Sequence, residues 1–172
     1  MNKQQHWQKS LAKGIDFERD VAGPLISTLY PNHLISRVAK DPKNLDGIYA
    51  YRGAKRQERF VLPDFQLFDK TNQEWLWIDS KYKEQPFSGR MLSRPNEKAV
   101  SLDATKHQQY IAFLNEYPGK LYFLFGIGQT KKIYLGDWNP NPEMVIFNNQ
   151  YNNGPTPTPV YYINDMQLVG AF

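Results

Sequence analysis

Two aspartates and a lysine follow apolar, strand-like runs of this chain, and their types are suited to chemistry. Asp64 lies in LPDF after the run RFV, and Asp79 and Lys81 follow the run WLWI. Side chains of a strand alternate between its two faces, so Asp79 and Lys81 project from the same face. If the turn DKTNQ joins the two runs as a hairpin, Asp64 lies opposite the DSK end of its partner. The sequence therefore predicts two carboxylates and one ammonium group close together.

Two close carboxylates repel each other, and the pKa of one rises unless a cation lies between them. A hard divalent ion such as Mg²⁺ prefers oxygen ligands, keeps several waters and relieves this repulsion. A lysine beside such an ion helps to activate a water or stabilises negative charge on a phosphoryl oxygen. Together these groups describe metal-assisted hydrolysis of a phosphodiester.

A third carboxylate comes from the N-terminal segment, which we expect to be helical from about residue 7 to residue 30. Its apolar side chains recur at helical spacing, and Glu18 lies on the same stripe, where an unpaired charge is expensive to bury. Glu18 either completes the metal site or marks an error in the assumed helical phase. Gly23 and Pro24 are expected to kink the helix or divide it. The stripe consists of Leu11, Ile15, Ala22, Leu25 and Leu29.

The remaining elements alternate between strands and a second helix. A helix is expected over residues 101–117, with Ser101 as its N-cap and with Ala104, His107, Ile111 and Leu114 on its inner face. The nearly continuous apolar run over residues 120–128 is typical of a central strand covered on both faces. This order of helix, strands, helix and strands predicts an α/β fold. Further strands are expected over residues 34–39, 47–51, 59–68, 75–83 and 131–138.

The chain is long enough for one domain with a single core. We assign residues 1–138 to this core and residues 139–172 to an Asn- and Pro-rich extension that packs on the same domain. Within it, TPTP favours extended polyproline-like backbone without stable pairing. The final segment, VYYINDMQLVGAF, is expected to pack back as a strand or short helix.

The motifs LPDF and WIDSKYK together resemble the PD-(D/E)XK nuclease superfamily, and GIDFERDVAGPL resembles the first helix of its Holliday junction resolvases. The resemblance covers roughly residues 10–138 and implies a restriction endonuclease-like core, with a mixed central β-sheet flanked by helices. It implies Glu18, Asp64, Asp79 and the Ser80 backbone carbonyl as metal ligands, and Lys81 as the catalytic lysine. Two features depart from the family: many members have Glu at the position of Asp79, and the Gln-x-x-x-Tyr element of RecB-like members is absent.

The resemblance further implies a Mg²⁺-dependent DNA endonuclease, with Mn²⁺ as substitute, acting on branched or recombination and repair intermediates. A homodimer would supply the two sites needed for symmetric cuts. The net charge of +4 is a mild indication of a polyanionic partner, and basic residues flank the WLWIDSKYK stretch. The residues expected to contact nucleic acid are Lys55, Arg56, Arg59, Lys83, Arg90, Arg94 and Lys106.

Composition and the absence of certain motifs exclude several other classes of protein. The absence of cysteine excludes disulfides, thiolate metal sites and a cysteine nucleophile. A polar start and the lack of a long apolar run predict a cytoplasmic protein without a membrane partner. No Gly-x-Ser-x-Gly elbow is present, and the GIG of residues 126–128 is interpreted as a turn and not as a phosphate loop.

Several alternatives stay open at this point. Asp79 and Lys81 could form a plain ion pair at a strand end, and Asp46 competes with Asp64 as the first acid. Lys106 and Tyr110 could contact phosphates or lie on a solvated helix face, and His107 is expected to be a structural histidine. For the whole chain, the alternatives are a non-catalytic module that binds nucleic acid or protein, and an aromatic-rich carbohydrate-binding sandwich with exposed tryptophans.

Overall fold

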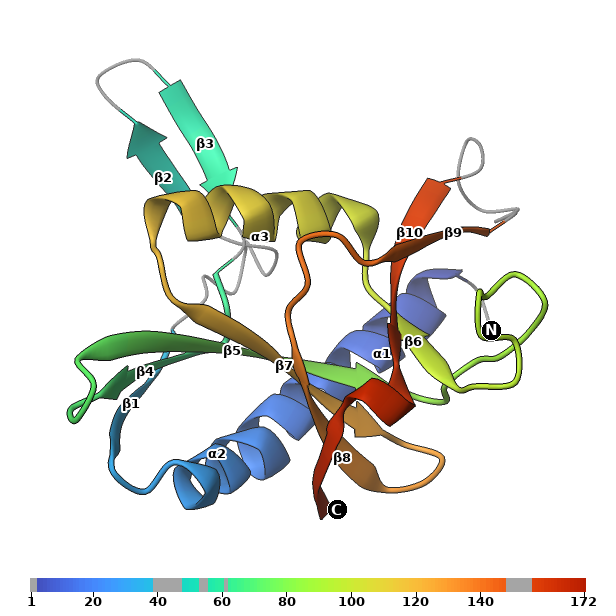
Figure 1. Ribbon diagram of the computed structural model, residues 1–172, viewed down its shortest axis with the longest axis horizontal. Helices are drawn as coiled ribbons and strands as arrows, with labels where there is room; N and C mark the ends of the chain where they lie inside the picture. The colour runs from blue at the N-terminus through green and yellow to red at the C-terminus, as the bar shows by residue number, and fades with distance from the viewer. Residues whose placement is uncertain (1–2, 39–47, 53–55, 61, 148–155) are drawn as a thin grey trace.

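A six-stranded sheet forms the centre of the computed structural model, which describes residues 3–38, 48–52, 56–60, 62–147 and 156–172. β5 and β7 are parallel, and the other neighbouring strands are antiparallel, so the sheet is mixed (Figure 1). The predicted α/β fold with a mixed central sheet flanked by helices is confirmed. The strands in spatial order are β1 (His33–Arg37), β4 (Phe65–Asp69), β5 (Glu74–Lys83), β7 (Lys120–Ile127), β8 (Lys132–Asp137) and β11 (Gln167–Ala171).

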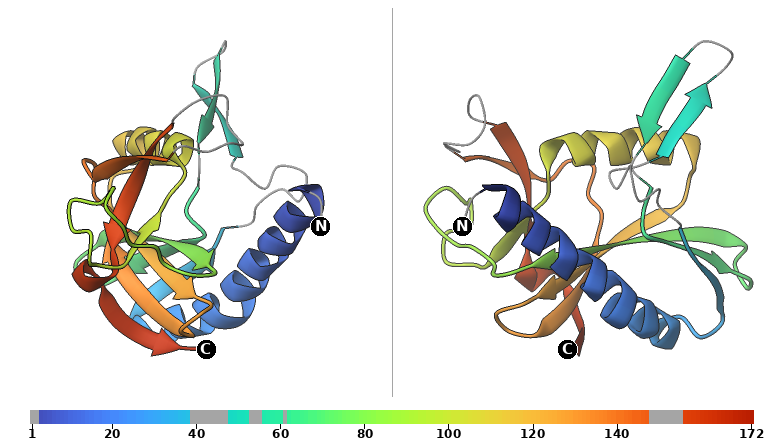
Figure 2. Two further views of the ribbon diagram at one scale, coloured as in Figure 1. Left: turned by 90° about the vertical axis from the view of Figure 1, so that its right-hand side faces the viewer. Right: turned by 180° about the vertical axis from the view of Figure 1, so that it is seen from behind.

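One continuous helical segment covers one face of this sheet, as the view from behind shows (Figure 2). It consists of α1 (Lys3–Asp16), the π-helical turn η1 (Phe17–Ala22) and α2 (Gly23–Leu29). Phe17 and Ile26 are buried against Ile78 and Leu124 of the sheet. A Cβ atom at Gly126 would lie 2.2 Å from the Phe17 ring, so only glycine lets this helix approach β7.

The π-helical turn shifts the helical phase that the sequence suggests. Ile15 was expected on the buried stripe, but 38% of it is exposed, whereas Phe17 is buried. The Gly23 N–H donates to the carbonyl of Glu18 five residues earlier, and Pro24 has no N–H to continue the regular pattern. The extra residue in this turn rotates the preceding helix relative to α2. The expected kink or division is therefore a π-helical turn within an unbroken segment.

The other face of the sheet is covered by α3 (Ala104–Glu116) and a three-stranded sheet of β6 (Ala99–Ser101), β10 (Thr156–Tyr162) and β9 (Glu143–Phe147). Tyr110 and Phe113 of α3 pack with Phe123 and Phe125 of β7. The Asp103 side chain accepts from the Lys106 N–H and caps α3. The expected N-cap at Ser101 is wrong, because β6 continues to that residue.

The segment after residue 139 is integrated into both sheets. TPTP was expected to be unpaired, but it begins β10, which pairs with β9 from Thr156 to Val160. Pro157 and Pro159 are tolerated because β6 pairs only with the later part of β10, so their missing N–H groups face no strand. After the short 3₁₀ helix η3 (Ile163–Asp165), β11 adds to the edge of the central sheet beside β8.

A separate hairpin of β2 (Ile48–Arg52) and β3 (Arg56–Phe60) projects beside α3 (Figure 1). The single strand expected over residues 59–68 is therefore wrong: β3 ends at Phe60, and β4 begins at Phe65. Pro63 lies in the interruption and cannot donate a ladder hydrogen bond. No helix in the described part of the chain is both long and apolar enough to cross a membrane.

Candidate active site

The hairpin of β4 and β5 brings Asp64 and Asp79 to the same level of the sheet. Phe65 and Ile78 form the last pair of this ladder. Asp64 precedes Phe65, and Asp79 follows Ile78, so the two aspartates occupy the next position on the two chains. Asp79 is completely buried, and only 1% of Asp64 is exposed. Apolar strand residues thus carry two carboxylates into the interior, where ionised groups are costly unless they are compensated.

Ser80 holds the Asp64 carboxylate through two hydrogen bonds. Its backbone N–H and its hydroxyl group donate to Asp64 Oδ2 over 2.8 Å and 2.6 Å. The N–H and C=O groups of one strand residue point to the same edge of the strand. The Ser80 carbonyl is therefore also directed to the edge where pairing with β4 has ended. The Ser80 carbonyl oxygen is therefore a third candidate metal ligand on the side of Asp64.

Two donors converge on Oδ2 of Asp79. The Lys81 ammonium forms an ion pair with it, and the Tyr110 hydroxyl donates to it over 2.5 Å. Burial raises the pKa of Tyr110 well above its usual value, and the negative charges of Asp79 and Asp64 raise it further. Because both carboxylates act on one hydroxyl group, both lie near Tyr110. We call Asp64, Asp79, Lys81 and Tyr110 the β5 cluster.

Sequence reasoning missed the position of Tyr110. It placed Tyr110 near a solvated helix face, whereas the buried residues of α3 are His107, Tyr110 and Phe113. The three-residue spacing of these rings was the available signal, but Ala104, Ile111 and Leu114 suggested another inner face. His107 is buried, as expected for a structural histidine, with Nε2 3.3 Å from the carbonyl oxygen of Pro140.

Glu18 forms an ion pair with a basic residue of β1. Its Oε1 accepts from Arg37 Nε over 2.9 Å, and 14% of the Glu18 side chain is exposed. Arg37 pairs with Phe65 in the ladder of β1 and β4, next to Asp64 in the chain. Within the described ranges, no three His, Cys, Asp or Glu side chains gather into a group able to hold a metal. The hydrogen bonds and ion pairs join Asp64 to Ser80, Asp79 to Lys81, and Glu18 to Arg37.

The donors that do gather fit a hard divalent cation. Mg²⁺ is commonly held by one or two carboxylates together with waters and substrate phosphate oxygens. Asp64 and Asp79 supply two carboxylates, and the Ser80 carbonyl is directed to the same edge. The Lys81 ammonium balances part of the negative charge of the two buried carboxylates.

Further lysines lie beside the β5 cluster. Lys83, on the same face of β5 as Asp79 and Lys81, is half-buried. Burial lowers the pKa of Lys83 to about 8, and the positive charges of Lys81 and Lys106 contribute to this decrease. Lys106 lies in the first turn of α3. Three ammonium groups from two elements therefore share one region.

The other basic residues selected from the sequence are placed differently. Arg90 is exposed in the irregular segment that precedes β6. Arg94 is engaged by Asp165 and Glu97, and its guanidinium lies 3.6 Å from the centroid of the Tyr162 ring. Lys55 and the competing acid Asp46 lie outside the described residues, as do the side chains of Arg56 and Arg59 on β3.

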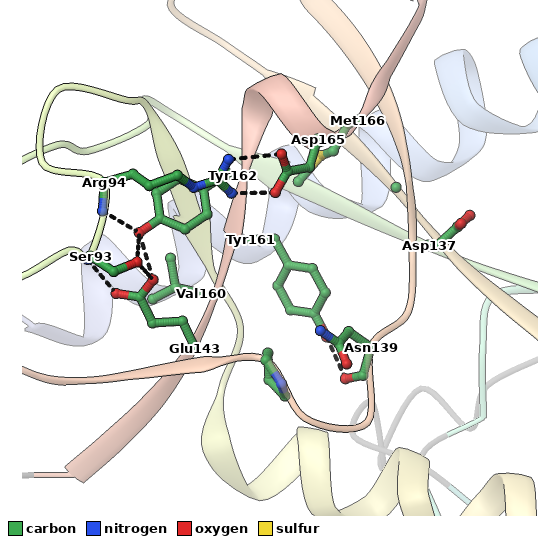
Figure 3. A pocket seen from close by; sticks show the side chains of 12 residues that line it. Ser93, Arg94, Asp137, Asn139, Glu143, Val160, Tyr161, Tyr162, Asp165 and Met166 are labelled. Atoms are coloured by element: carbon green, nitrogen blue, oxygen red, sulfur yellow. Dashed lines mark hydrogen bonds and ion pairs between the residues drawn. The ribbon is translucent and has the colours of Figure 1, made fainter.

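A cavity of about 420 Å³ lies beside Arg94 and not at the β5 cluster (Figure 3). Ser93 donates to both oxygens of Glu143, and the Tyr162 hydroxyl donates to Glu143 Oε2 over 2.6 Å. These bonds fasten residues 85–98 to the three-stranded sheet. We call this group, which consists of Ser93, Arg94, Glu143, Tyr162 and Asp165, the loop cluster.

Comparison with solved structures finds several similar chains, and one of them is an archaeal resolvase. The Holliday junction resolvase Hjc of the archaeon Archaeoglobus fulgidus has a TM-score of 0.42 and 18% sequence identity, over 72% of this chain and 76% of Hjc. No protein-family model and no curated protein matches the chain. At this identity the likeness concerns the arrangement of the chain and not its chemistry.

Proposed function

We propose that this protein is a metal-dependent endonuclease that hydrolyses phosphodiester bonds of DNA. The observation that carries the proposal is the buried pair of Asp64 and Asp79 with the Lys81 ammonium on Asp79. Two buried acids beside a lysine are an expensive arrangement for stability alone. Buried acids in contact with a lysine are therefore candidates for a functional site.

Asp64, Asp79 and the Ser80 carbonyl would hold Mg²⁺, or Mn²⁺ in its place. When bound, the ion would polarise the phosphoryl group and make a water more acidic. Ser80 orients Asp64 through its N–H and hydroxyl groups, and Tyr110 orients Asp79. Lys81, held by Asp79, would donate to a phosphoryl oxygen and stabilise the charge that grows there.

The basic residues beside the site would bind the DNA backbone. Lys83 lies close enough to Lys81 and Lys106 for their charges to interact, and Arg90 is exposed in the segment between β5 and β6. Lys55, Arg56 and Arg59 remain part of the proposal through the sequence of the hairpin region. Such contacts give an affinity that depends on salt and little on sequence. Arg94 is the weakest candidate, because its guanidinium is already paired.

Branched DNA is the proposed substrate, on the basis of the resemblance to Holliday junction resolvases in the GIDFERDVAGPL segment. Symmetric cleavage of a junction requires two active sites, so the working form would be a homodimer. Light scattering of the protein with and without a synthetic four-way junction measures the number of chains per complex. A single chain on the junction would contradict the dimer.

Cleavage of plasmid, duplex and four-way-junction DNA with Mg²⁺ tests the proposed activity. Asp79→Asn and Lys81→Ala are expected to lose cleavage, whereas the charge-matched controls Asp137→Asn and Lys70→Ala, both at exposed positions, retain it. Thermal unfolding of each variant separates lost chemistry from lost folding. Equal nicking by wild type, Asp79→Asn and Lys81→Ala would refute the assignment.

A non-catalytic nucleic-acid-binding module is the second candidate. This candidate is favoured by the contacts of Asp79. Lys81 and Tyr110 both donate to its buried carboxylate and stabilise it without any metal. Adding Mg²⁺ or Mn²⁺ raises the melting temperature only if the native protein binds the ion. A rise in wild type that Asp64→Asn abolishes supports the enzyme, and an unchanged melting temperature supports the module.

A further inference from the structure

A half-buried ammonium group without an ion-pair partner lies next to the candidate active site. Lys83 ends β5, and no acid within the described residues forms an ion pair with it. Lysine is rarely withdrawn from water without a partner, because a partly desolvated charge raises the free energy of the fold. A lysine in this position therefore indicates a ligand that is itself negatively charged.

The packing of α3 on β5 brings two further lysines to the same place. The hydrogen bond from Tyr110 to Asp79 fixes the two elements relative to each other. Lys106 lies one helical turn before Tyr110, about 6 Å along the helix axis. Lys81 lies two residues beyond Asp79, about 7 Å along the strand. Lys106 on α3 and Lys81 on β5 therefore lie at similar distances along their elements from the hydrogen bond between Tyr110 and Asp79.

The lysines around Lys83 act unfavourably on its charge. Burial, Lys81 and Lys106 all disfavour the charged form of Lys83, and Asp103 at the start of α3 opposes them. Asp103 also accepts a hydrogen bond from the Lys106 N–H as the helix cap. A bound anion between the lysines would relieve the repulsion that these side chains now experience.

We infer that Lys83 and Lys106, together with Lys81, form a subsite for a phosphate group of the nucleic acid adjacent to the group that is cleaved. This inference rests on the proposed function and adds where the substrate is held. Lysine binds phosphate as a compact positive charge that does not depend on a planar geometry. The subsite lies on the α3 face of β5, beyond the oxygens of Asp64 and Asp79 along the strand, so it positions the substrate without replacing the metal ligands.

Binding of a short fluorescent DNA duplex in EDTA tests the subsite without any need for metal or cleavage. Lys83→Gln and Lys106→Gln are expected to weaken binding and to reduce the slope of log affinity against log salt by about one unit each. Lys70→Gln is the matched control, because it removes the same charge from the exposed turn between β4 and β5. It should bind as wild type does.

Thermal unfolding supplies a second readout that separates a ligand-binding lysine from a structural one. Lys83→Gln removes an unpaired, half-buried charge, so its melting temperature should rise while its affinity for DNA falls. A fall in both would show that Lys83 supports the fold and would overturn the inference. Wild-type affinity and salt slope in both Lys83→Gln and Lys106→Gln would overturn it as well.

The source of the phosphate is distinguished by comparing duplexes with and without a 5′-phosphate and a circular DNA without ends. Loss of the lysine effect without the 5′-phosphate identifies a terminal phosphate, and an equal effect on the circle identifies an internal one; either result supports the subsite. If the lysine variants bind normally while Asp79→Asn abolishes cleavage, the subsite inference is refuted and the proposed cleavage activity stands. If the lysines matter for binding but Asp79→Asn cleaves as wild type, the proposed chemistry fails and phosphate binding remains.

Discussion

Two polar clusters of this protein are each built around a buried tyrosine that donates to a carboxylate. In the β5 cluster Tyr110 donates to Asp79, and in the loop cluster Tyr162 donates to Glu143. Tyr110 is fully buried, and Tyr162 is 6% exposed. The two bonds are alike in chemistry, but their surroundings differ in charge.

The loop cluster is a set of opposite charges that satisfy one another. Asp165 binds Arg94, while Ser93 and Tyr162 supply the donors of Glu143. Burial acts to raise the pKa of Glu143, but the hydrogen bonds from Ser93 and Tyr162 lower it below its usual value. Such an arrangement stabilises the fold and leaves little capacity for a new ligand.

The β5 cluster contains one ion pair, between Lys81 and Asp79, and a second buried carboxylate, that of Asp64. Two buried aspartates lie near one tyrosine, and three lysines share the adjacent region. The cavity of about 420 Å³ lies at the loop cluster, so its volume does not point to the β5 cluster. The concentration of buried charged groups is what makes the β5 cluster the candidate site.

The largest expected effect comes from Asp64→Asn. Loss of one of the two acids should reduce the cleavage rate by on the order of 100-fold or more, the usual scale for removing a group that stabilises the transition state. Stability should be unchanged or higher, because one of two repelling charges is removed. Glu143→Gln is the counterpart in the loop cluster, and its folded fraction should cleave at the wild-type rate. Equal losses of cleavage rate in both variants would show that the two clusters do not differ in their role in cleavage.

Tyr110→Phe should lower the cleavage rate by about tenfold. A hydrogen bond to an ionised group is worth about 1.5–3 kcal/mol, and about 1.4 kcal/mol corresponds to a factor of ten in rate. If Tyr110 positions Asp79, the concentration of Mg²⁺ required for half-maximal rate should also rise. A lower melting temperature with an unchanged rate and Mg²⁺ requirement would make Tyr110 merely structural.

Tyr162→Phe is the matched change in the loop cluster. It should lower the free energy of unfolding by about 1 kcal/mol, the typical net value of one hydrogen bond, or the melting temperature by about 2–4 °C. Trypsin should then cut faster after Arg90, because residues 85–98 are less firmly held. A loss of cleavage in a fully folded Tyr162→Phe protein would assign the loop cluster a direct role.

The smallest expected effect concerns pH. Lys83 has a pKa of about 8 in the folded protein against 10.5 for an ordinary lysine, so between these values the unfolded state binds more protons. Stability therefore rises with pH over this interval, and below about pH 8 the charged Lys83 opposes folding. Wild type should thus gain stability relative to Lys83→Met between about pH 8 and pH 10.5. Parallel pH profiles for the two proteins would contradict the strained placement of Lys83.

Some of the site was predictable because it depends on the local chain. The alternation WLWIDSKYK predicts Asp79, Lys81 and Lys83 on one face, and the turn at residues 69–73 predicts Asp64 beside them. The continuous apolar run of β7 predicted a strand covered on both faces, and its central residues Phe123, Leu124 and Phe125 are completely buried. These features follow from backbone geometry within a strand or a single hairpin.

Other parts depended on contacts between distant segments. The phase of the first helix changed at the π-helical turn, and Glu18 found Arg37 as its partner. The prolines of TPTP suggested an unpaired segment because the position of β6 along β10 could not be known from composition. The partner of Glu18 and the pairing of TPTP depend on the positions of remote strands.

By itself, the sequence determined that two acids and a lysine would share one end of a hairpin, since strand alternation is a property of the local backbone. Only the tertiary structure decided that Tyr110 donates a hydrogen bond to Asp79 and that Lys106 lies close to Lys83. It also decided that Glu18 pairs with Arg37. The physical reason is that a helix presents any of several faces to a sheet. The face that is buried depends on the packing of the whole core and not on the helix sequence alone.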